Sequence, residues 1–383
     1  MKNHKSPGTG SINAGRILLG LIFIVGGFYA LISILFYPET KNIVLTISLF
    51  LGAFSLVAAI FLCRRWWLFV IAAALLITGC CFAGIEWYNS SIKIDDTPNW
   101  REWRPNIENS RVAHLEDEAS LKLTEDLPRM DGATALYPVY AAFAAAVYPE
   151  DAITYQVLDC STTAWAYEKI VDGDCDIVFC AAPSQAQVDY AREKGVELVF
   201  TPIGKEAFVF YVNAKNPLEN VSIADIRGIW SGKITRWDEL GVEKLGAIRP
   251  FQREEGSGSQ STFVKLMGDT PIMEPEQEDV IGDMGGVIRK TADYRNYKNA
   301  IGYSFRFFAT VMNPNVGIRL LSVNGVSPTR ENIENGSYPL ADCFYAVTRL
   351  DADDNTRALL EWICGPQGQA LVELTGYTGF AEK

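Results

Sequence analysis

Apolar residues are arranged differently in the two parts of this chain. The first part contains three nearly unbroken apolar runs, at residues 17–36, 43–63 and 66–85. Each run is close to the ~20 residues that a helix needs to cross the hydrocarbon core of a bilayer. The first run lacks a small-residue cleavage site and is followed by two more, so a removable signal peptide is not expected. The pattern predicts a membrane anchor of three transmembrane helices within residues 1–88.

The basic residues predict the orientation of this anchor. They are Lys2, Lys5, Arg16, Arg64 and Arg65. All of them fall on the same side of the predicted spans, and basic flanks favour the cytoplasm. The N-terminus is therefore expected in the cytoplasm, and the chain after residue 88 outside the cell membrane. Residues 89–126 are polar and lack apolar periodicity, so we expect an extracytoplasmic linker there.

From Leu127 onward, short apolar runs of strand length alternate with segments of helix length. This alternation is typical of an α/β domain with mostly parallel strands. Three expected strand ends run into small or hydroxyl residues that open helices, within residues 129–134, 154–163 and 176–184. Because ligands gather at the carboxyl ends of parallel strands, Thr134 and Ser161 are candidates for ligand contact. Ordinary helix capping by these residues is the alternative.

A glycine- and serine-rich loop at residues 253–263 follows a short expected strand and leads into a helix. Glycines let the backbone approach a ligand closely, and the first amides of a helix point outward with the positive end of its dipole. Arg253 adds a planar, permanently charged guanidinium group that suits a tetrahedral oxyanion. Hydroxyl donors come from Ser257, Ser259 and Ser261. The loop predicts an oxyanion cradle, with a solvated surface loop as the alternative.

Charge and composition narrow the class of function. With a net charge of −12, the chain is not expected to bind nucleic acid, whereas a small anion is held by local donors and needs no net positive charge. The only two histidines, His4 and His114, lie outside the segments expected to fold. A Ser-His-Asp hydrolase or a histidine-ligated metal centre is therefore poorly supported. We expect no enzyme activity, no cofactor and no metal ion.

Five cysteines follow the anchor, namely Cys160, Cys175, Cys180, Cys343 and Cys364. None of them has the C-x-x-C spacing of a metal site. Cys160 and Cys180 each follow an expected strand closely, so they are the first pair to test for a disulfide. Buried free thiols are the alternative.

Six motifs follow one another in the second part of the chain. They are Asp131–Thr134 with Tyr137 and Pro138, Ser161–Thr163, Asp176–Pro183, Ser231–Trp237, Arg253–Phe263 and Ala300–Tyr303. With this ordered set, residues 127–383 resemble the phosphate-binding protein of the phosphate ABC transporter, in the type 2 periplasmic binding protein superfamily. Each motif alone is a weak signal, and the set in this order is specific. The resemblance does not extend to the apolar N-terminal part.

The resemblance implies an α/β, two-lobed type 2 periplasmic-binding-protein fold, preceded here by the three transmembrane helices. Two strands would cross between the lobes, near residues 208–212 and 344–348. The lobes would then comprise residues 127–210 with 346–383 for the first, and residues 211–345 for the second.

The resemblance also implies which residues hold the anion between the lobes. The ligand-binding residues would be Thr134, Ala135, Ser161, Arg253, Ser257, Gly258 and Ser259. Supporting residues would be Thr162 and Glu255, of which Glu255 would orient Arg253. Ala181 departs from the family pattern, since the family has an aspartate there that accepts the proton of a protonated phosphate. A site without this acceptor is expected to select less strictly among tetrahedral oxyanions.

These features predict a membrane-anchored solute-binding protein outside the cytoplasm. It would capture phosphate, or a similar tetrahedral oxyanion, and deliver it to the permease subunits of an ABC transporter. The alternative is an anion sensor or interaction protein that couples ligand occupancy to a membrane partner, because three spans are more than tethering needs. An enzyme with Ser257 or Ser259 as nucleophile lacks a general base near these serines in sequence.

Overall fold

The computed structural model describes residues 100–275, 279–281, 287–288, 290–291, 298–315 and 317–380. The expected spans at 17–36, 43–63 and 66–85 lie outside the described residues. In these described ranges, no helix is both long enough and apolar enough to cross a membrane. All described residues belong to one compact unit.

A seven-stranded sheet forms the frame of both lobes, in the order β1-β2-β11-β3-β8-β5, with β9 also paired to β3. Its strands are β1 (Met130–Gly132), β2 (Ile177–Cys180), β3 (Leu198–Asn213), β5 (Arg249–Pro250), β8 (Ala300–Phe305), β9 (Ile318–Leu320) and β11 (Ala341–Arg349). Two small parallel pairs complete the second lobe, β4 (Asn220–Val221) with β10 (Ser322–Val323), and β6 (Gln252–Arg253) with β7 (Val280–Ile281).

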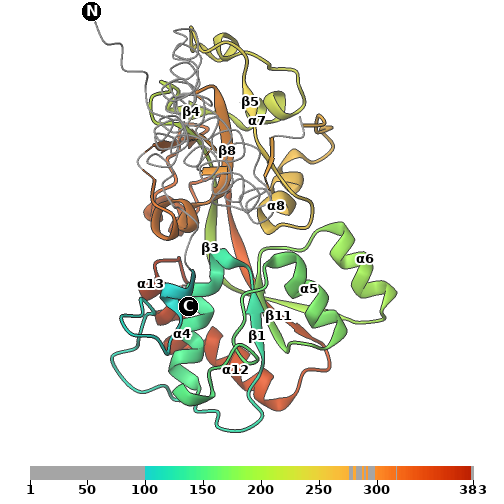
Figure 1. Ribbon diagram of the computed structural model, residues 1–383, viewed down its shortest axis with the longest axis vertical. Helices are drawn as coiled ribbons and strands as arrows, with labels where there is room; N and C mark the ends of the chain where they lie inside the picture. Colours follow the sequence, from blue (N-terminus) through green and yellow to red (C-terminus); the bar gives the residue numbers. More distant parts are fainter. Residues whose placement is uncertain are drawn as a thin grey trace, which may run out of the picture. The chain divides into compact units, whose positions relative to one another are not determined.

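Strand β3 connects the lobes because it changes partner along its length. Up to Ala207 it pairs with β11, and from Phe208 it pairs with β8 and then β9, antiparallel throughout. Figure 1 shows β3 and β11 running lengthwise between the two lobes. The first crossing lies close to the expected 208–212. The second lies at the start of β11, opposite Ala207, and so precedes the expected 344–348.

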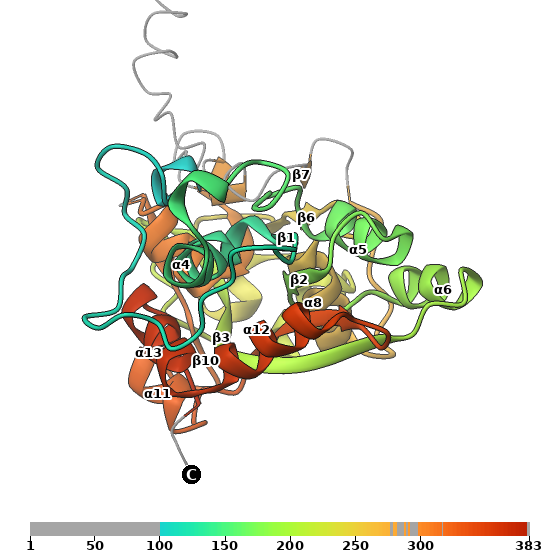
Figure 2. The same cartoon turned by 90° about the horizontal axis from the view of Figure 1, so that it is seen from below.

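Helices cover both faces of the first-lobe sheet. They are α4 (Tyr137–Val147), α5 (Thr163–Asp172), α6 (Gln185–Glu193), α12 (Asp354–Cys364) and α13 (Pro366–Thr375). Helices α4, α12 and α13 lie on one side of β1 and β11, and α5 with α6 lies on the other (Figures 1 and 2). Almost every residue of α4 is buried, and its alanines allow close packing. The ring of Tyr140 stacks on Phe179 of β2 at 5.0 Å between centroids.

The second lobe is built around an aromatic cluster. The helices among its described residues include α7 (Ile223–Trp230), α8 (Gly258–Met267) and the short α11 (Arg330–Glu334). Phe263 of α8 stacks on Tyr303 of β8 at 4.6 Å, and Trp230 of α7 packs on both rings. The Tyr303 hydroxyl also hydrogen-bonds to Gln260 of α8. The cluster therefore fixes α8 relative to the sheet.

Residues 100–126, expected as part of a linker, pack against the first lobe. Trp103, Val112, Ala119 and Leu123 are buried, and the ring of Trp100 meets Tyr137 of α4 edge-on at 4.7 Å. Apolar residues spread singly along an irregular segment gave no periodic signal, so the sequence did not reveal this packing.

Two smaller expectations differ from the structure. The strand expected at 154–158 forms only a single bridge, between Leu158 and Met130, because a turn closes at Thr154. Cys160 and Cys180 are not joined, and the cysteines of the described residues are free thiols.

Candidate functional site

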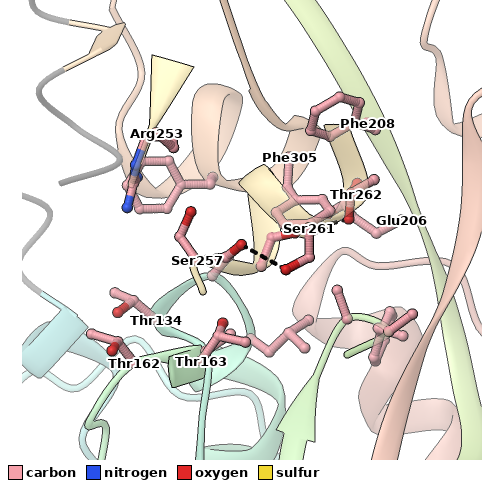
Figure 3. Close-up of a pocket in the computed structure, with 18 of the residues that line it drawn as sticks. Thr134, Thr162, Thr163, Glu206, Phe208, Arg253, Ser257, Ser261, Thr262 and Phe305 are labelled. Carbon is pink, nitrogen blue, oxygen red and sulfur yellow. Dashed lines mark hydrogen bonds between the residues drawn. The ribbon is translucent and has the colours of Figure 1, made fainter. Parts of the chain in front are cut away.

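A cavity of about 470 Å³ lies between the two lobes. The first lobe contributes residues 133–136, 162–165 and 181–183, and the second contributes residues 253–255, 257–258, 261–262 and 265. Residues of the connecting strands, among them Glu206, Phe208 and Phe344, close its inner end. Figure 3 shows how the polar side chains from both lobes face this space.

The turn between β1 and α4 supplies the first part of the wall. Thr134 and Ala135 line the cavity and begin the short 3₁₀ turn Thr134–Leu136, which leads into α4. No side chain caps this turn, so its first amides are not taken by a local hydroxyl. Gly132 is required just before it, because a Cβ there would lie 2.4 Å from the carbonyl oxygen of Phe179.

The turn before α5 supplies the second part, and its backbone is strained. Thr162 lines the cavity with φ 83° and ψ 164°, a region that is essentially restricted to glycine. Such a conformation costs about 1–3 kcal/mol and persists only when its surroundings hold it. Thr163, the first residue of α5, lines the cavity as well. No side chain caps this helix either.

The carboxylate of Asp131 fixes the turn before α5 through hydrogen bonds to Ser161. Its Oδ1 accepts the amide of Ser161 at 2.8 Å, and its Oδ2 accepts the Ser161 hydroxyl at 2.6 Å. The Lys169 ammonium lies 2.7 Å from Asp131 Oδ2 and 2.6 Å from Asp159 Oδ2. Burial acts to lower the pKa of Lys169, but the hydrogen bonds to both carboxylates outweigh it and raise the pKa above its ordinary value. Lys169 therefore stays charged, and the network fixes residues 159–163.

The loop before α8 supplies the wall of the second lobe. Arg253 is 9% exposed, and its backbone amide donates to Gln260 Oε1 and to the Tyr303 hydroxyl, both at 3.1 Å. Ser257 caps α8, since its Oγ accepts the amide of Gln260 at 3.3 Å and donates to the carbonyl of Glu254 at 3.0 Å. The Arg253 side chain is thus carried by a loop that is anchored at both ends.

Three helical segments from two lobes therefore begin at this cavity. The first residues of the 3₁₀ turn, of α5 and of α8 are Thr134, Thr163 and Gly258, and all three line it. The N-terminal amides of helices carry partial positive charge and bind anions. Arg253 adds a full positive charge to the same space. Such an arrangement can hold a small, strongly charged anion.

The lobes touch at the edge of the cavity. A Cβ added to Gly258 would lie 3.0 Å from Thr163 Oγ1, and Gln187 Nε2 donates to the carbonyl of Gly256 at 3.3 Å. Gly256 has a φ of +82°, which favours glycine. The two glycines of the loop thus allow both the turn and the close approach of α5.

Seven of the nine residues predicted for the site lie on the cavity wall. They are Thr134, Ala135, Thr162, Arg253, Glu255, Ser257 and Gly258. Ser161 and Ser259 are not part of the wall: the Ser161 hydroxyl donates to Asp131, and Ser259 is fully buried within α8. Ser261, expected as a hydroxyl donor of the loop, also lies on the wall, whereas Thr163, Thr262 and Glu206 were not among the predicted site residues. Thr163 and Thr262 had a signal, because they belong to the Ser161–Thr163 and Arg253–Phe263 motifs, whereas Glu206 had none.

Ala181 lies on the wall after β2, as expected, and brings no carboxylate to it. Its carbonyl accepts the Tyr167 hydroxyl at 2.9 Å, and its Cβ faces Gly258 across the cavity. The acids that line the cavity elsewhere are Glu206, Glu254, Glu255 and Asp342.

Glu206 is the buried acid of this set. It lies on β3 and is 8% exposed, and its two carboxylate oxygens accept the amides of Ala207 at 2.7 Å and Phe307 at 3.2 Å. Burial raises the pKa of Glu206 to about 7, against the lowering effect of these hydrogen bonds and of the nearby charge of Arg306. Glu206 therefore changes charge near neutral pH.

This shift predicts a pH-dependent stability. Between the ordinary glutamate value of about 4.5 and about 7, the folded protein retains a proton on Glu206 that the unfolded chain releases. The free energy of unfolding should therefore fall as pH rises through this window, by about 3 kcal/mol in total. Urea unfolding at several pH values would measure the slope, and Glu206→Gln should flatten it. An equal slope in the variant would contradict the assignment.

The other charged or titratable groups near Glu206 are Arg306, Tyr377 and the Lys265–Asp342 ion pair.

A family model described as a PBP superfamily domain matches residues 123–367, which is well over half of the chain. The chain belongs to the PBP superfamily. This membership confirms the superfamily that the ordered motifs predicted, and the two-lobed α/β fold agrees with it.

Two curated relatives of this PBP domain are both named as phosphate-binding proteins. Phosphate-binding protein PstS 2 of Streptococcus agalactiae serotype V is 30% identical over 138 residues, which cover 34% of this chain and 45% of that protein. The match thus spans less than half the length of this relative. Phosphate-binding protein PstS of Bacillus subtilis is 25% identical over 258 residues, covering 67% of this chain and 79% of that protein.

Solved structures agree with the fold of the PBP domain. A protein from Clostridium perfringens, described as a phosphate ABC transporter substrate-binding protein with bound phosphate, has a TM-score of 0.51 at 21% identity. The match covers 67% of this chain and 100% of that chain. At this identity the likeness concerns the fold alone.

Proposed function

We propose that this PBP domain is a solute-binding protein that holds phosphate, or a similar tetrahedral oxyanion, between its lobes. The observation that carries the proposal is the meeting of three helix starts and Arg253 at one cavity, with donors from both lobes. The names of the relatives in Streptococcus agalactiae and Bacillus subtilis support phosphate as the anion.

Each lobe would contribute its own donors to the anion. The first lobe would use the hydroxyl of Thr134, the amide of Ala135 and the start of α5 at Thr162 and Thr163. The second lobe would use the guanidinium group of Arg253 and the start of α8 at Ser257 and Gly258. Ser161 would act indirectly, by tying this turn to Asp131. Ser259, which is buried, would contribute its backbone amide.

Ala181 bears on the choice of anion. A protonated phosphate needs an acceptor for its hydroxyl, and an unmet hydroxyl costs about 1–3 kcal/mol. With alanine at this position, we infer that the site discriminates weakly between phosphate and fully deprotonated oxyanions such as sulfate.

A thermal-shift screen of the full-length protein would test the function. We expect phosphate to stabilise the protein, by about 2.7 kcal/mol at a concentration of 100 times the dissociation constant. Sulfate and arsenate should stabilise it as well, and the response to phosphate should differ little between pH 6 and pH 8. If none of these anions raises the melting temperature, the proposed function is wrong.

We further propose that residues 1–88 anchor the domain in the cell membrane, with the N-terminus in the cytoplasm and the domain outside. The anion would pass to the permease subunits of an ABC transporter, with opening and closing of the lobes as the coupled change. A sensor that reports anion binding to another membrane protein is the alternative, because three apolar runs exceed what a tether needs. Co-purification distinguishes them: permease subunits support transport, and a kinase or other signalling protein supports sensing.

A further inference from the structure

The cavity extends beyond the oxyanion cradle. Its volume of about 470 Å³ lies in the range of about 300–1,000 Å³ that holds whole organic ligands, whereas inorganic phosphate is far smaller. Figure 3 shows Arg253 and Glu206 on opposite sides of the cavity, with Phe208, Phe305 and Thr262 close to Glu206. The Glu206 half is therefore space that the oxyanion alone does not use.

Aromatic rings line this second half, together with Glu206 and its cross-strand neighbour Asp342. The rings belong to Phe208, Phe305, Phe308, Phe344 and Tyr377. All except Phe305 are nearly fully buried, so their positions are fixed by packing. Aromatic faces attract cations, and they do so most strongly where water is excluded.

The carboxylate of Glu206 has the charge of Arg306 nearby but no cationic hydrogen-bond partner in the described part of the chain. None of the ion pairs in that part involves it, and its oxygens accept only the amides of Ala207 and Phe307. Each oxygen keeps a lone pair for another donor. The neighbouring acid of the cavity, Asp342, is already paired with Lys265 at 2.7 Å. A buried carboxylate and aromatic faces together can compensate an ammonium group for the water that it loses on binding.

We propose that the Glu206 half is a second subsite, which binds the ammonium group of a zwitterionic ligand whose oxyanion lies beside Arg253. The ligand class is an aminoalkyl phosphonate or aminoalkyl phosphate monoester. This inference rests on the proposed function, since it assigns the oxyanion end to the same cradle. The inference goes beyond the proposed function, because inorganic phosphate would then fill only the oxyanion end of the cavity.

Calorimetry on the full-length protein would test the subsite. The probes are aminoethylphosphonate and aminopropylphosphonate, each paired with the alkylphosphonate that lacks the amine, and inorganic phosphate. We expect at least one amine to bind about tenfold more tightly than the alkylphosphonate that lacks the amine. If phosphate binds and neither amine exceeds its pair, the subsite is refuted and the proposed function stands. If no probe binds, both are refuted.

Two variants locate the effect. Glu206→Gln should abolish the advantage of the amine while phosphate and the alkylphosphonates keep their affinity within about twofold. Glu254→Gln removes an exposed acid of the same cavity near Arg253 and should leave the advantage intact. If both variants lose the affinity advantage of the amine equally, the ammonium group does not bind at Glu206. The comparison of paired ligands on the unmodified protein does not depend on how either variant folds.

Discussion

Replacing Arg253 with alanine is expected to weaken phosphate binding by at least about 2–5 kcal/mol, the cost of removing one partner from a buried, charged contact. Arg253 is 9% exposed and lies on a loop that Tyr303 and Gln260 hold in place. The loss should therefore come from the missing guanidinium group, because the loop keeps its other contacts. Isothermal titration calorimetry with phosphate measures the change directly.

Two further variants make this result specific. Arg253→Lys keeps the charge but loses the planar fork, so its affinity should lie between those of the native protein and the alanine variant. Arg192→Ala removes an arginine that is 70% exposed on α6 and should leave the affinity unchanged. An unchanged dissociation constant in Arg253→Ala would show that the anion does not bind beside this residue.

Asp131→Ala is expected to destabilise the folded protein by about 3–5 kcal/mol, the typical cost of breaking a buried ion pair on one side. The side chain of Asp131 is 1% exposed, and it accepts hydrogen bonds from Ser161, Gly132 and Lys169. Without it, the strained backbone of Thr162 loses the contacts that hold its position. Phosphate affinity should fall as well, because Thr162 and Thr163 would no longer be fixed.

Urea unfolding measures the stability change, and an exposed ion pair provides the control. Asp351 lies 3.0 Å from Arg349 with its side chain 73% exposed, so Asp351→Ala should change the stability little. If Asp131→Ala lowers stability as little as the control does, the proposed role of Asp131 in holding the cradle is wrong.

The local chemistry of the sequence predicted the superfamily and a set of candidate residues for the site. Strand ends followed by small residues, and a loop with Arg253 and two glycines, are short-range signals that survive in any context. They led to seven residues that do lie on the cavity wall. Ser161 was placed there because a hydroxyl after a strand end resembles a ligand donor. Its actual partner, Asp131, is 30 residues away, and such pairing depends on the register of β1.

Glu206 shows why the remainder could not be predicted. In the sequence it is one acid within a strand of 16 residues, and nothing around it indicates burial. It enters the cavity wall because β3 passes between the lobes at this position, where its neighbours in space come from residues near 305–308 and 340–344. Contacts made by several distant segments leave no pattern in the residues beside Glu206. The packing of residues 100–126 could not be predicted for a similar reason, since Trp103 and Leu123 are buried by a surface formed elsewhere in the chain.

The position of β11 has a consequence for how the chain is made. This strand lies in the middle of the first-lobe sheet, between β2 and β3, although it follows the whole second lobe in sequence. During synthesis, β2 and the first half of β3 each keep an unpaired edge until β11 (Ala341–Arg349) has left the ribosome. The second lobe is nearly contiguous and can complete its own sheet earlier. The first lobe, which the ribosome begins first, is therefore the last to finish folding, and its waiting strand edges are where aggregation of the nascent chain would start.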